Sequence, residues 1–274
     1  MYELLDLRKV FNDGTAALDG LTLTVGPGEQ VAVVGPSGAG KTTLFRIMNL
    51  TLLPTSGIVR LDGIDVTRLS DVELRQARMR IGTIYQQHNL VGRLKVVHNV
   101  LAGHLGRWST AVALYSFLRP QDADGARRAL AQVGIPEKLY ARTDELSGGQ
   151  QQRVAIARLL IQNPDIILAD EPVSSVDPSL ASGIVALLTE LSTGSRKTLL
   201  MNLHSVDLAL AHFPRIVGVR DGRVHFDLSP DKVTRALLEG LYAGDQDEAT
   251  PWEPLRPGQG PFGGACRPLP GFST

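Results

Sequence analysis

One short stretch, GPSGAGKTT, has the residue types and the spacing that hold the phosphates of a nucleotide. From Gly35 to Thr42 it matches G-x-x-x-x-G-K-[ST], and it follows the apolar run QVAVV and precedes a helical pattern, as that motif requires. Its glycines let backbone N–H groups curl around the β- and γ-phosphates, and Lys41 adds a positive charge. The sequence therefore predicts a phosphate-binding loop, which consists of Gly35, Pro36, Ser37, Gly38, Ala39, Gly40, Lys41, Thr42 and Thr43.

Two adjacent carboxylates, Asp170 and Glu171, follow the apolar run IILA. Because neighbouring side chains of a strand point to opposite faces of the sheet, we expect the two acids to have different tasks. Asp170 is suited to hold Mg²⁺ through water, beside the Thr42 hydroxyl, which is a hard oxygen ligand. Glu171 is suited to polarise an attacking water. Such a pair alone is as often a solvated turn, but the upstream phosphate loop favours the catalytic interpretation.

A second glycine-containing stretch, LSGGQQQRVAIARLL, runs from Leu146 to Leu160. Ser147, Gly148 and Gly149 stand at the start of a strongly helical run, where backbone N–H groups and the helix dipole together attract anions. The chain therefore contains two phosphate-binding devices that lie far apart in the sequence. A nucleotide site within one chain would need only the first, so the second device requires an explanation.

The composition is ordinary for a globular protein. Of 274 residues, 43% are hydrophobic and 20% are charged, and 28 basic residues balance 28 acidic ones. A neutral charge balance argues weakly against a protein that coats nucleic acid or anionic lipid through bulk charge, and a local basic patch stays open as an alternative. We expect no nucleic-acid partner. The single Cys266 cannot form an internal disulfide.

The first residues, MYELLDLRKV, lack the apolar segment of a signal peptide. No uninterrupted apolar run reaches the roughly 18 residues that a membrane span requires. We therefore expect a chain that does not span a membrane and that reaches one only through partners.

Short apolar runs alternate with helical patterns along most of the chain. After an N-terminal group of strand patterns, the spacing is helical between about His88 and Glu145, and later strands and helices alternate. This order indicates an α/β fold with a largely parallel sheet that is buried on both faces. Strands are expected at 2–10, 21–25, 30–35, 57–63, 80–85, 165–170 and 197–204, helices at 41–50, at 148–162 and after 178, and a hairpin at 215–227.

The composition changes after Ala243. Residues 244–274 are rich in proline and glycine and have no apolar periodicity. We expect them to form a poorly ordered tail.

Together the motifs closely resemble one family, the ATP-binding-cassette (ABC) ATPases. The signature of that family, LSGGQ, is present without a substitution from Leu146 to Gln150, and it is highly specific beside a phosphate loop. The resemblance covers residues 1 to about 240. It implies an α/β P-loop NTPase (RecA-like) core with a largely parallel sheet, an antiparallel β-subdomain and a helical signature subdomain at about 88–165, all within an ATPase domain of residues 1–243.

The resemblance also implies roles for single residues. Gln86, or its neighbour Gln87, matches the glutamine that joins the metal site to the helical subdomain. Asp177 ends the segment SSVD, which matches the D-loop of the family. His204 matches the switch histidine that contacts the γ-phosphate, and its alternative is a core position. Phe11 stands where the family places an aromatic ring against adenine, and it too has a core position as its alternative.

The family resemblance explains the second phosphate-binding device. In this family two copies form a head-to-tail homodimer, and each ATP lies between the phosphate loop of one copy and the signature of the other. ATP binding closes the dimer and hydrolysis opens it. The implied cofactors are ATP and Mg²⁺. The implied signature contacts are Ser147, Gly148, Gly149 and Gln150, the metal site consists of Thr42, Gln86 and Asp170, and the catalytic residues are Lys41, Glu171 and His204.

The interval between the two halves of the site indicates what the ATPase drives. The segment 88–145 is short. It lacks both the sustained heptads and the Cys/His cluster that chromosome-associated members carry. The chain also has one cassette, whereas translation-factor members have two. The resemblance thus implies the ATPase subunit of a prokaryotic importer, peripheral on the cytoplasmic face of the cell membrane. Its partners would be an integral membrane permease and, indirectly, a solute-binding protein.

The segment NLVGRLKVVHNVLAGHLGR, at 89–107, resembles the phosphonate-importer ATPases. In the family it meets the permease and not the cargo, so phosphate, phosphite and other small solutes stay open as alternatives. A soluble phosphoryl-transfer enzyme such as a small-molecule kinase is a more distant alternative. It would need an acceptor pocket, and it would have no use for LSGGQ, Glu171 and His204 together.

Overall fold

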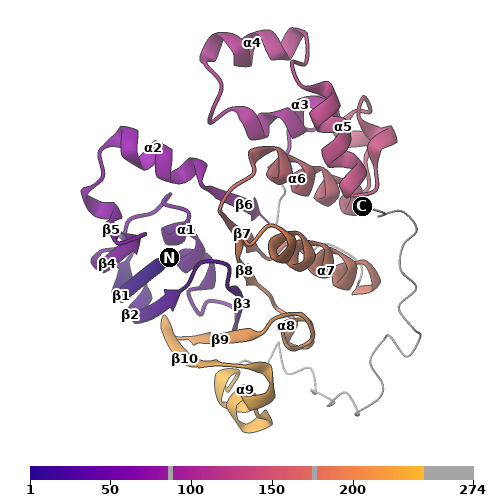
Figure 1. Ribbon diagram of the computed structural model, residues 1–274. Helices are drawn as coiled ribbons and strands as arrows, with labels where there is room; N and C mark the ends of the chain where they lie inside the picture. Colours follow the sequence, from indigo (N-terminus) through magenta and orange to yellow (C-terminus); the bar gives the residue numbers. More distant parts are fainter. Residues whose placement is uncertain (86–88, 175–177, 244–274) are drawn as a thin grey trace. The chain divides into compact units, whose positions relative to one another are not determined.

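The apolar runs pair side by side in a six-stranded sheet of the computed structural model, which describes residues 1–85, 89–174 and 178–243 (Figure 1). The strand order is β10-β9-β3-β8-β7-β6, and every neighbouring pair from β9 to β6 is parallel. The strands are β3 (Gln30–Val34), β6 (Ile81–Tyr85), β7 (Ile166–Asp170), β8 (Thr198–Asn202), β9 (Arg215–Arg220) and β10 (Arg223–Leu228). The predicted α/β fold with a largely parallel sheet is confirmed.

A second, antiparallel sheet has four strands in the order β2-β1-β4-β5. The hydroxyl of Tyr2, which is 1% exposed, donates to the carbonyl oxygen of Met48 at 2.6 Å and so ties this sheet to helix α1 (Lys41–Met48). The strands are β1 (Tyr2–Val10), β2 (Ala16–Val25), β4 (Ser56–Leu61) and β5 (Ile64–Asp65).

Helices cover the sheets and connect the parallel strands. Between β6 and β7 the described residues form four α-helices, of which α3, α5 and α6 pack against one another. The α-helices are α1 (Lys41–Met48), α2 (Asp71–Met79), α3 (Val96–Leu101), α4 (Thr110–Leu118), α5 (Ala123–Gln132), α6 (Gly148–Gln162), α7 (Pro178–Gly194), α8 (Val206–His212) and α9 (Arg235–Leu241). Single 3₁₀ turns are η1 (Val66–Arg68), η2 (Ala102–His104), η3 (Pro136–Lys138), η4 (Thr143–Glu145) and η5 (Pro230–Lys232).

Three helices, α2, α8 and α9, lie where the sequence pattern did not predict any. Helix α2 begins with a capping box, because the Ser70 hydroxyl accepts from the Glu73 N–H and the Glu73 carboxylate accepts from the Ser70 N–H at 2.9 Å. The S-x-x-E spacing was therefore an available signal. Helix α9 is capped by Thr234, whose side chain accepts from the N–H of Leu237.

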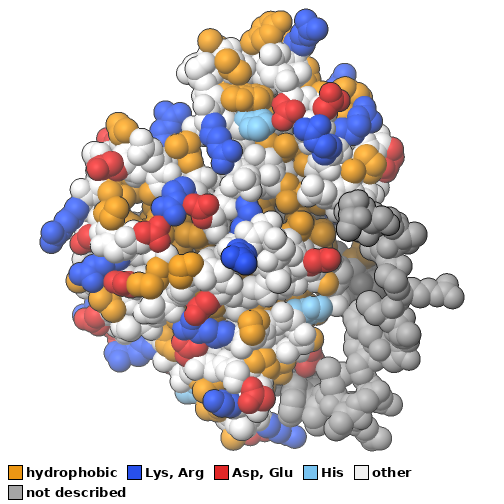
Figure 2. All heavy atoms as spheres, in the orientation of Figure 1, with side chains coloured by type: hydrophobic (Ala, Val, Ile, Leu, Met, Phe, Trp, Pro, Cys, Tyr) orange, Lys and Arg blue, Asp and Glu red, His pale blue; other side chains and the backbone are white. Residues whose placement is uncertain are grey.

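Helix α4 presents apolar side chains to solvent. Figure 2 shows hydrophobic side chains gathered over it, at the top of the view. The exposed ones are Val112, Leu114, Tyr115, Phe117 and Leu118. Of the helices in the described ranges, none combines the length and the apolar character needed to cross a bilayer.

Candidate active site

The phosphate loop leaves the carboxyl end of β3 and leads into α1. Gly35 has φ 152° and Gly40 has φ 98°, a region of backbone space that glycine adopts without strain. A Cβ atom at Gly35 would collide with the carbonyl oxygen of Val219, and one at Gly40 would collide with that of Ala17. The loop therefore packs directly on the backbone of its neighbours, and glycine at these two positions is required by space as well as by conformation.

The Lys41 side chain folds back into this loop. It is 5% exposed, and its ammonium group donates to the carbonyl oxygens of Gly35 at 2.5 Å and Pro36 at 2.8 Å. These contacts hold the positive charge within the curl of the loop, where the motif requires it for phosphate binding. The role of Lys41 in phosphate binding remains a prediction.

Asp170 ends β7, the strand that is separated from β3 by β8. The Nδ2 atom of Asn202 donates to its Oδ1 atom at 2.7 Å. Burial raises the pKa of Asp170 above its usual value, and hydrogen bonding from Asn202 and from Thr42 opposes this rise. The structure thus brings the Thr42 hydroxyl and the Asp170 carboxylate together from two different elements.

The donor set of this corner fits Mg²⁺. Thr42 and Asp170 offer a hydroxyl and a carboxylate, which are the hard oxygen ligands that Mg²⁺ prefers. The described residues contain no cluster of three or more His, Cys, Asp or Glu side chains that could enclose a metal ion by themselves. Mg²⁺ typically takes one or two protein oxygens and completes its shell with phosphates and water.

Glu171 lies just beyond β7, in contact with His204. The Nε2 atom of His204 is 2.7 Å from Oε1 of Glu171, and because a carboxylate can only accept, the imidazole donates. This hydrogen bond lowers the pKa of Glu171 below its usual value, against the effect of burial. Glu171 is therefore held as an ionised carboxylate, the form that can polarise a water.

The backbone of Glu171 is left-handed, with φ 50°, which costs an ordinary residue free energy and is concentrated at functional sites. Its N–H donates to the carbonyl oxygen of Asn202 at 3.2 Å. We expected strand alternation to separate Asp170 from Glu171. Strand β7 ends at Asp170, so Glu171 lies outside it and strand alternation does not apply to the pair. The chain leaves the direction of the strand at Glu171, through its left-handed backbone.

The predicted second anion-binding device lies at the N-terminus of α6. Ser147 caps the helix, because its hydroxyl accepts from the Gln150 N–H and the Gln150 side chain accepts from the Ser147 N–H at 3.1 Å. Ser147 and Gly148 are exposed, and Gly149 and Gln150 are half-buried. Helix α6 packs on α3 and α5, whereas α1 packs on β2 and β7. The helix end is thus available at the surface and belongs to a different part of the molecule from the phosphate loop.

Phe11 follows β1 and is half-buried. The Nζ atom of Lys9 lies 5.6 Å from the centre of its ring, a cation–π distance. The ring lines an open hollow of about 530 Å³. This arrangement is compatible with stacking on a base.

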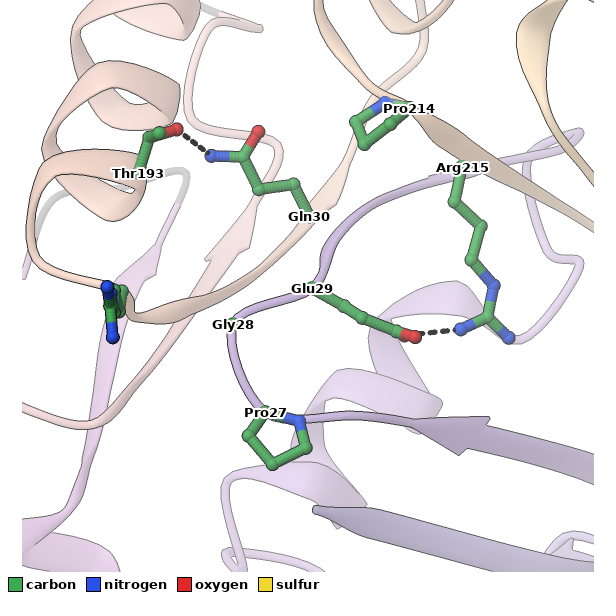
Figure 3. A pocket seen from close by; sticks show the side chains of 8 residues that line it. Pro27, Gly28, Glu29, Gln30, Thr193, Pro214 and Arg215 are labelled. Carbon is green, nitrogen blue, oxygen red and sulfur yellow. Dashed lines mark hydrogen bonds and ion pairs between the residues drawn. The ribbon is translucent and has the colours of Figure 1, made fainter.

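A larger hollow, of about 710 Å³, lies elsewhere (Figure 3). Gln30 and Arg215 line it, and they begin β3 and β9, so it lies at the amino edge of the parallel sheet. Two pairs of polar side chains in it interact, since Arg215 contacts Glu29 at 2.5 Å and Gln30 donates to Thr193 at 2.8 Å. Ligands of such sheets bind at the carboxyl edge, so this hollow does not compete with the phosphate loop.

Several predicted site residues lie outside the described residues. These are Gln86, its alternative Gln87, and the segment 175–177 with Asp177. The roles given to them by family resemblance remain predictions. The sequence analysis missed Asn202, which contacts both Asp170 and Glu171. The available signal was a polar residue directly after the apolar run TLLM.

Known proteins are similar to most of this chain. The family model described as "ABC transporter" matches residues 18–174. The phosphonates import ATP-binding protein PhnC 1 of Pseudomonas syringae pv. syringae (strain B728a) is 49% identical over 235 residues, which are 86% of this chain and 89% of that protein. The PhnC protein of Pseudomonas putida (strain KT2440) is 46% identical over 84% of this chain and 86% of its own length.

Solved structures match as well. The dimeric structure of MJ0796, a bacterial ABC transporter cassette, superposes with a TM-score of 0.74 at 33% identity, over 84% of this chain and 99% of that chain. A post-hydrolysis dimer of the same cassette, bound to ADP and Pi, gives a TM-score of 0.71 at 33% identity, with the same shares of both chains covered.

Proposed function

This chain belongs to the ABC transporter family, and we propose that it is the ATP-hydrolysing subunit of a prokaryotic importer for phosphonates. The observation that carries the ATPase part is the contact between Glu171 and His204 beside a complete phosphate loop. The phosphonate part rests on relatives that are named phosphonate import proteins and are 45% to 49% identical to most of this chain.

The residues of this chain divide the work of hydrolysis. Backbone N–H groups of the loop and the ammonium group of Lys41 bind the β- and γ-phosphates and stabilise the charge that develops during phosphoryl transfer. Glu171 orients and polarises the attacking water. His204 fixes the Glu171 carboxylate through the 2.7 Å hydrogen bond. Thr42 and Asp170 would hold Mg²⁺, which neutralises phosphate charge when bound.

The exposed N-terminus of α6 supports a dimeric site. Among the described residues α6 packs on α3, α5, η2 and β6, whereas the phosphate loop leads into α1, which packs on β2 and β7. The cassette MJ0796 forms a dimer. In our proposal two copies of this chain face each other head to tail, so that Ser147–Gln150 of one copy closes on the ATP held by the other.

The proposed membrane partner is an integral permease, with a solute-binding protein acting indirectly. Helix α4 supports such a partner, because a contiguous exposed apolar surface commonly marks a contact with another molecule. The position that follows is peripheral, on the cytoplasmic face of the cell membrane. Phosphate and phosphite are the alternative cargoes, because the cassette does not touch the solute.

Growth tests the proposal. A Pseudomonas strain that lacks its own PhnC receives this chain together with the genes that flank it, and methylphosphonate is the only phosphorus source. We expect growth with the parent chain and none with Glu171→Gln. Growth on phosphite but not on methylphosphonate would overturn the cargo. A purified chain that hydrolyses no ATP would overturn the ATPase itself.

A further inference from the structure

Strand β8 ends in a polar residue that is fully buried. All five residues of β8 (Thr198–Asn202) are buried, and the last of them, Asn202, is 0% exposed. In the parallel register Asn202 stands beside Val33 of β3 on one side and Asp170 of β7 on the other. Asn202 therefore occupies the strand position between the phosphate loop and the two acids.

Asn202 contacts both acids. Its Nδ2 atom donates to Oδ1 of Asp170 at 2.7 Å, and its backbone oxygen accepts from the N–H of Glu171 at 3.2 Å. The first contact fixes the orientation of one carboxylate. The second fixes the peptide at which the chain turns into the left-handed conformation of Glu171, with φ 50°.

The amide of Asn202 is only half satisfied. Its Oδ1 atom is buried and has no hydrogen-bond partner among the residues that the structure describes. A buried acceptor without a donor opposes folding, and an apolar residue would continue the packing of this strand. The stability of the sheet therefore does not explain an asparagine here, whereas the contact to Asp170 does.

We propose that Asn202 is a positioning residue for the metal site, which holds the Asp170 carboxylate in the orientation that Mg²⁺ requires and anchors the turn of Glu171. The inference rests on the proposed ATPase function, because it assigns the metal to Asp170. Residues that orient a metal ligand typically change metal affinity by about 10- to 100-fold when they are replaced. Replacing Asn202 should therefore change the Mg²⁺ dependence of nucleotide binding, and not only the affinity for the nucleotide itself.

Nucleotide affinity with and without metal tests the inference. The affinity for a fluorescent ATP analogue is measured in EDTA and across a Mg²⁺ titration, for the parent and for Asn202→Leu, which removes the amide and keeps the branching at Cγ. We expect a parent-like affinity in EDTA and a Mg²⁺ concentration for half-maximal effect that is raised about 10- to 100-fold. Mn²⁺ binding in the presence of a non-hydrolysable analogue, measured by EPR, should weaken in parallel.

The matched control is Thr198→Val, which removes a buried polar group at the opposite end of the same strand and should leave the metal dependence unchanged. Asn202→Thr provides a second variant if Asn202→Leu does not fold, because its hydroxyl is too short to replace the amide. An unchanged Mg²⁺ dependence in a folded Asn202 variant would overturn the inference, as would equal losses of affinity with and without metal. A parent chain that binds no ATP would instead overturn the proposed function and this inference with it.

Discussion

The Nε2 atom of His204 lies 2.7 Å from Oε1 of Glu171, and the two residues follow the carboxyl ends of neighbouring strands, β8 and β7. This contact joins an imidazole that is 39% exposed to a carboxylate that is 17% exposed. The hydrogen bond lowers the pKa of Glu171. A general base needs this combination of a fixed orientation, an ionised state at neutral pH and access to solvent.

Replacing Glu171 with Gln preserves the shape of the side chain and removes the charge that polarises water. We expect retained ATP binding, hydrolysis lowered by about 10²- to 10⁴-fold, and a dimer that accumulates in ATP with Mg²⁺. Hydrolysis assays and sizing chromatography measure these effects. Glu190→Gln, at an exposed position of α7, is the control. Only monomer under these conditions would contradict the closure of the dimer by ATP.

Replacing Lys41 with Ala removes the positive charge from the phosphate loop. A hydrogen bond to a charged group contributes about 1.5–3 kcal/mol, so ATP affinity should fall roughly 10- to 100-fold, along with hydrolysis. Equilibrium binding of labelled ATP measures the affinity. Lys232→Ala removes a charge from an exposed turn and should have no effect. Parent-like affinity in the Lys41 variant would show that the loop does not hold the phosphates as described.

The loop and the parallel sheet were predictable because each depends on a local pattern. G-x-x-x-x-G-K-T after an apolar run specifies a strand, a turn of backbone N–H groups and a helix, and the structure has β3, the loop and α1 in this order. The parallel sheet was predictable because each apolar run and each helical pattern is recognised from residues that are close together in the sequence. Helix α2 was missed although its Ser70–Glu73 capping box was present in the sequence.

The contacts between strands were not predictable in the same way. Asn202 and Asp170 are paired by the register of β8 against β7, and the sequence does not specify which residues of two distant strands stand side by side. The hydrogen bond between them and the left-handed backbone of Glu171 depend on that register. Family resemblance supplied the role of Glu171, but only the folded chain brings Asn202 to both acids.

Acid should reveal the contribution of Asp62 to stability. Its carboxylate contacts the Met1 ammonium at 2.5 Å and Arg80 at 2.8 Å, and these contacts lower its pKa below the usual value. The stabilisation is therefore present above the unfolded pKa and is lost as the pH falls through the lower folded pKa. We expect Asp62→Asn to cost less than about 1 kcal/mol at pH 7, as exposed ion pairs do. Urea unfolding should show the difference disappear towards pH 3, and a constant difference would refute this assignment.

Removing the residues after Gly244 should leave ATP hydrolysis largely intact. This expectation comes from the sequence, where residues 244–274 carry no motif and no periodic apolar face, and these residues lie outside those that the structure describes. The hydrolysis rate of the truncated chain, compared with that of the full chain, checks it. A truncated protein that melts like the parent and hydrolyses no ATP would assign the tail a role in the site.

Mixing two inactive variants tests whether the site is shared between two copies. Lys41→Ala damages the phosphate loop, and Ser147→Arg places a long side chain where a small hydroxyl caps α6. Each homodimer should be inactive, because each of its two sites contains one damaged half. In a mixed dimer both lesions fall in one site. The other site combines the intact loop of the Ser147 variant with the intact signature of the Lys41 variant.

A shared site therefore predicts that the mixture regains one competent site per mixed dimer. Single-turnover cleavage of ATP is the suitable measurement, since steady turnover can require both sites of a dimer. A site contained within one chain predicts the opposite, because every subunit of the mixture would stay damaged. Two differently tagged variants, purified in succession, establish that mixed dimers have formed. If such a sample cleaves no ATP, the head-to-tail arrangement is wrong, and the exposed N-terminus of α6 has no phosphate to bind.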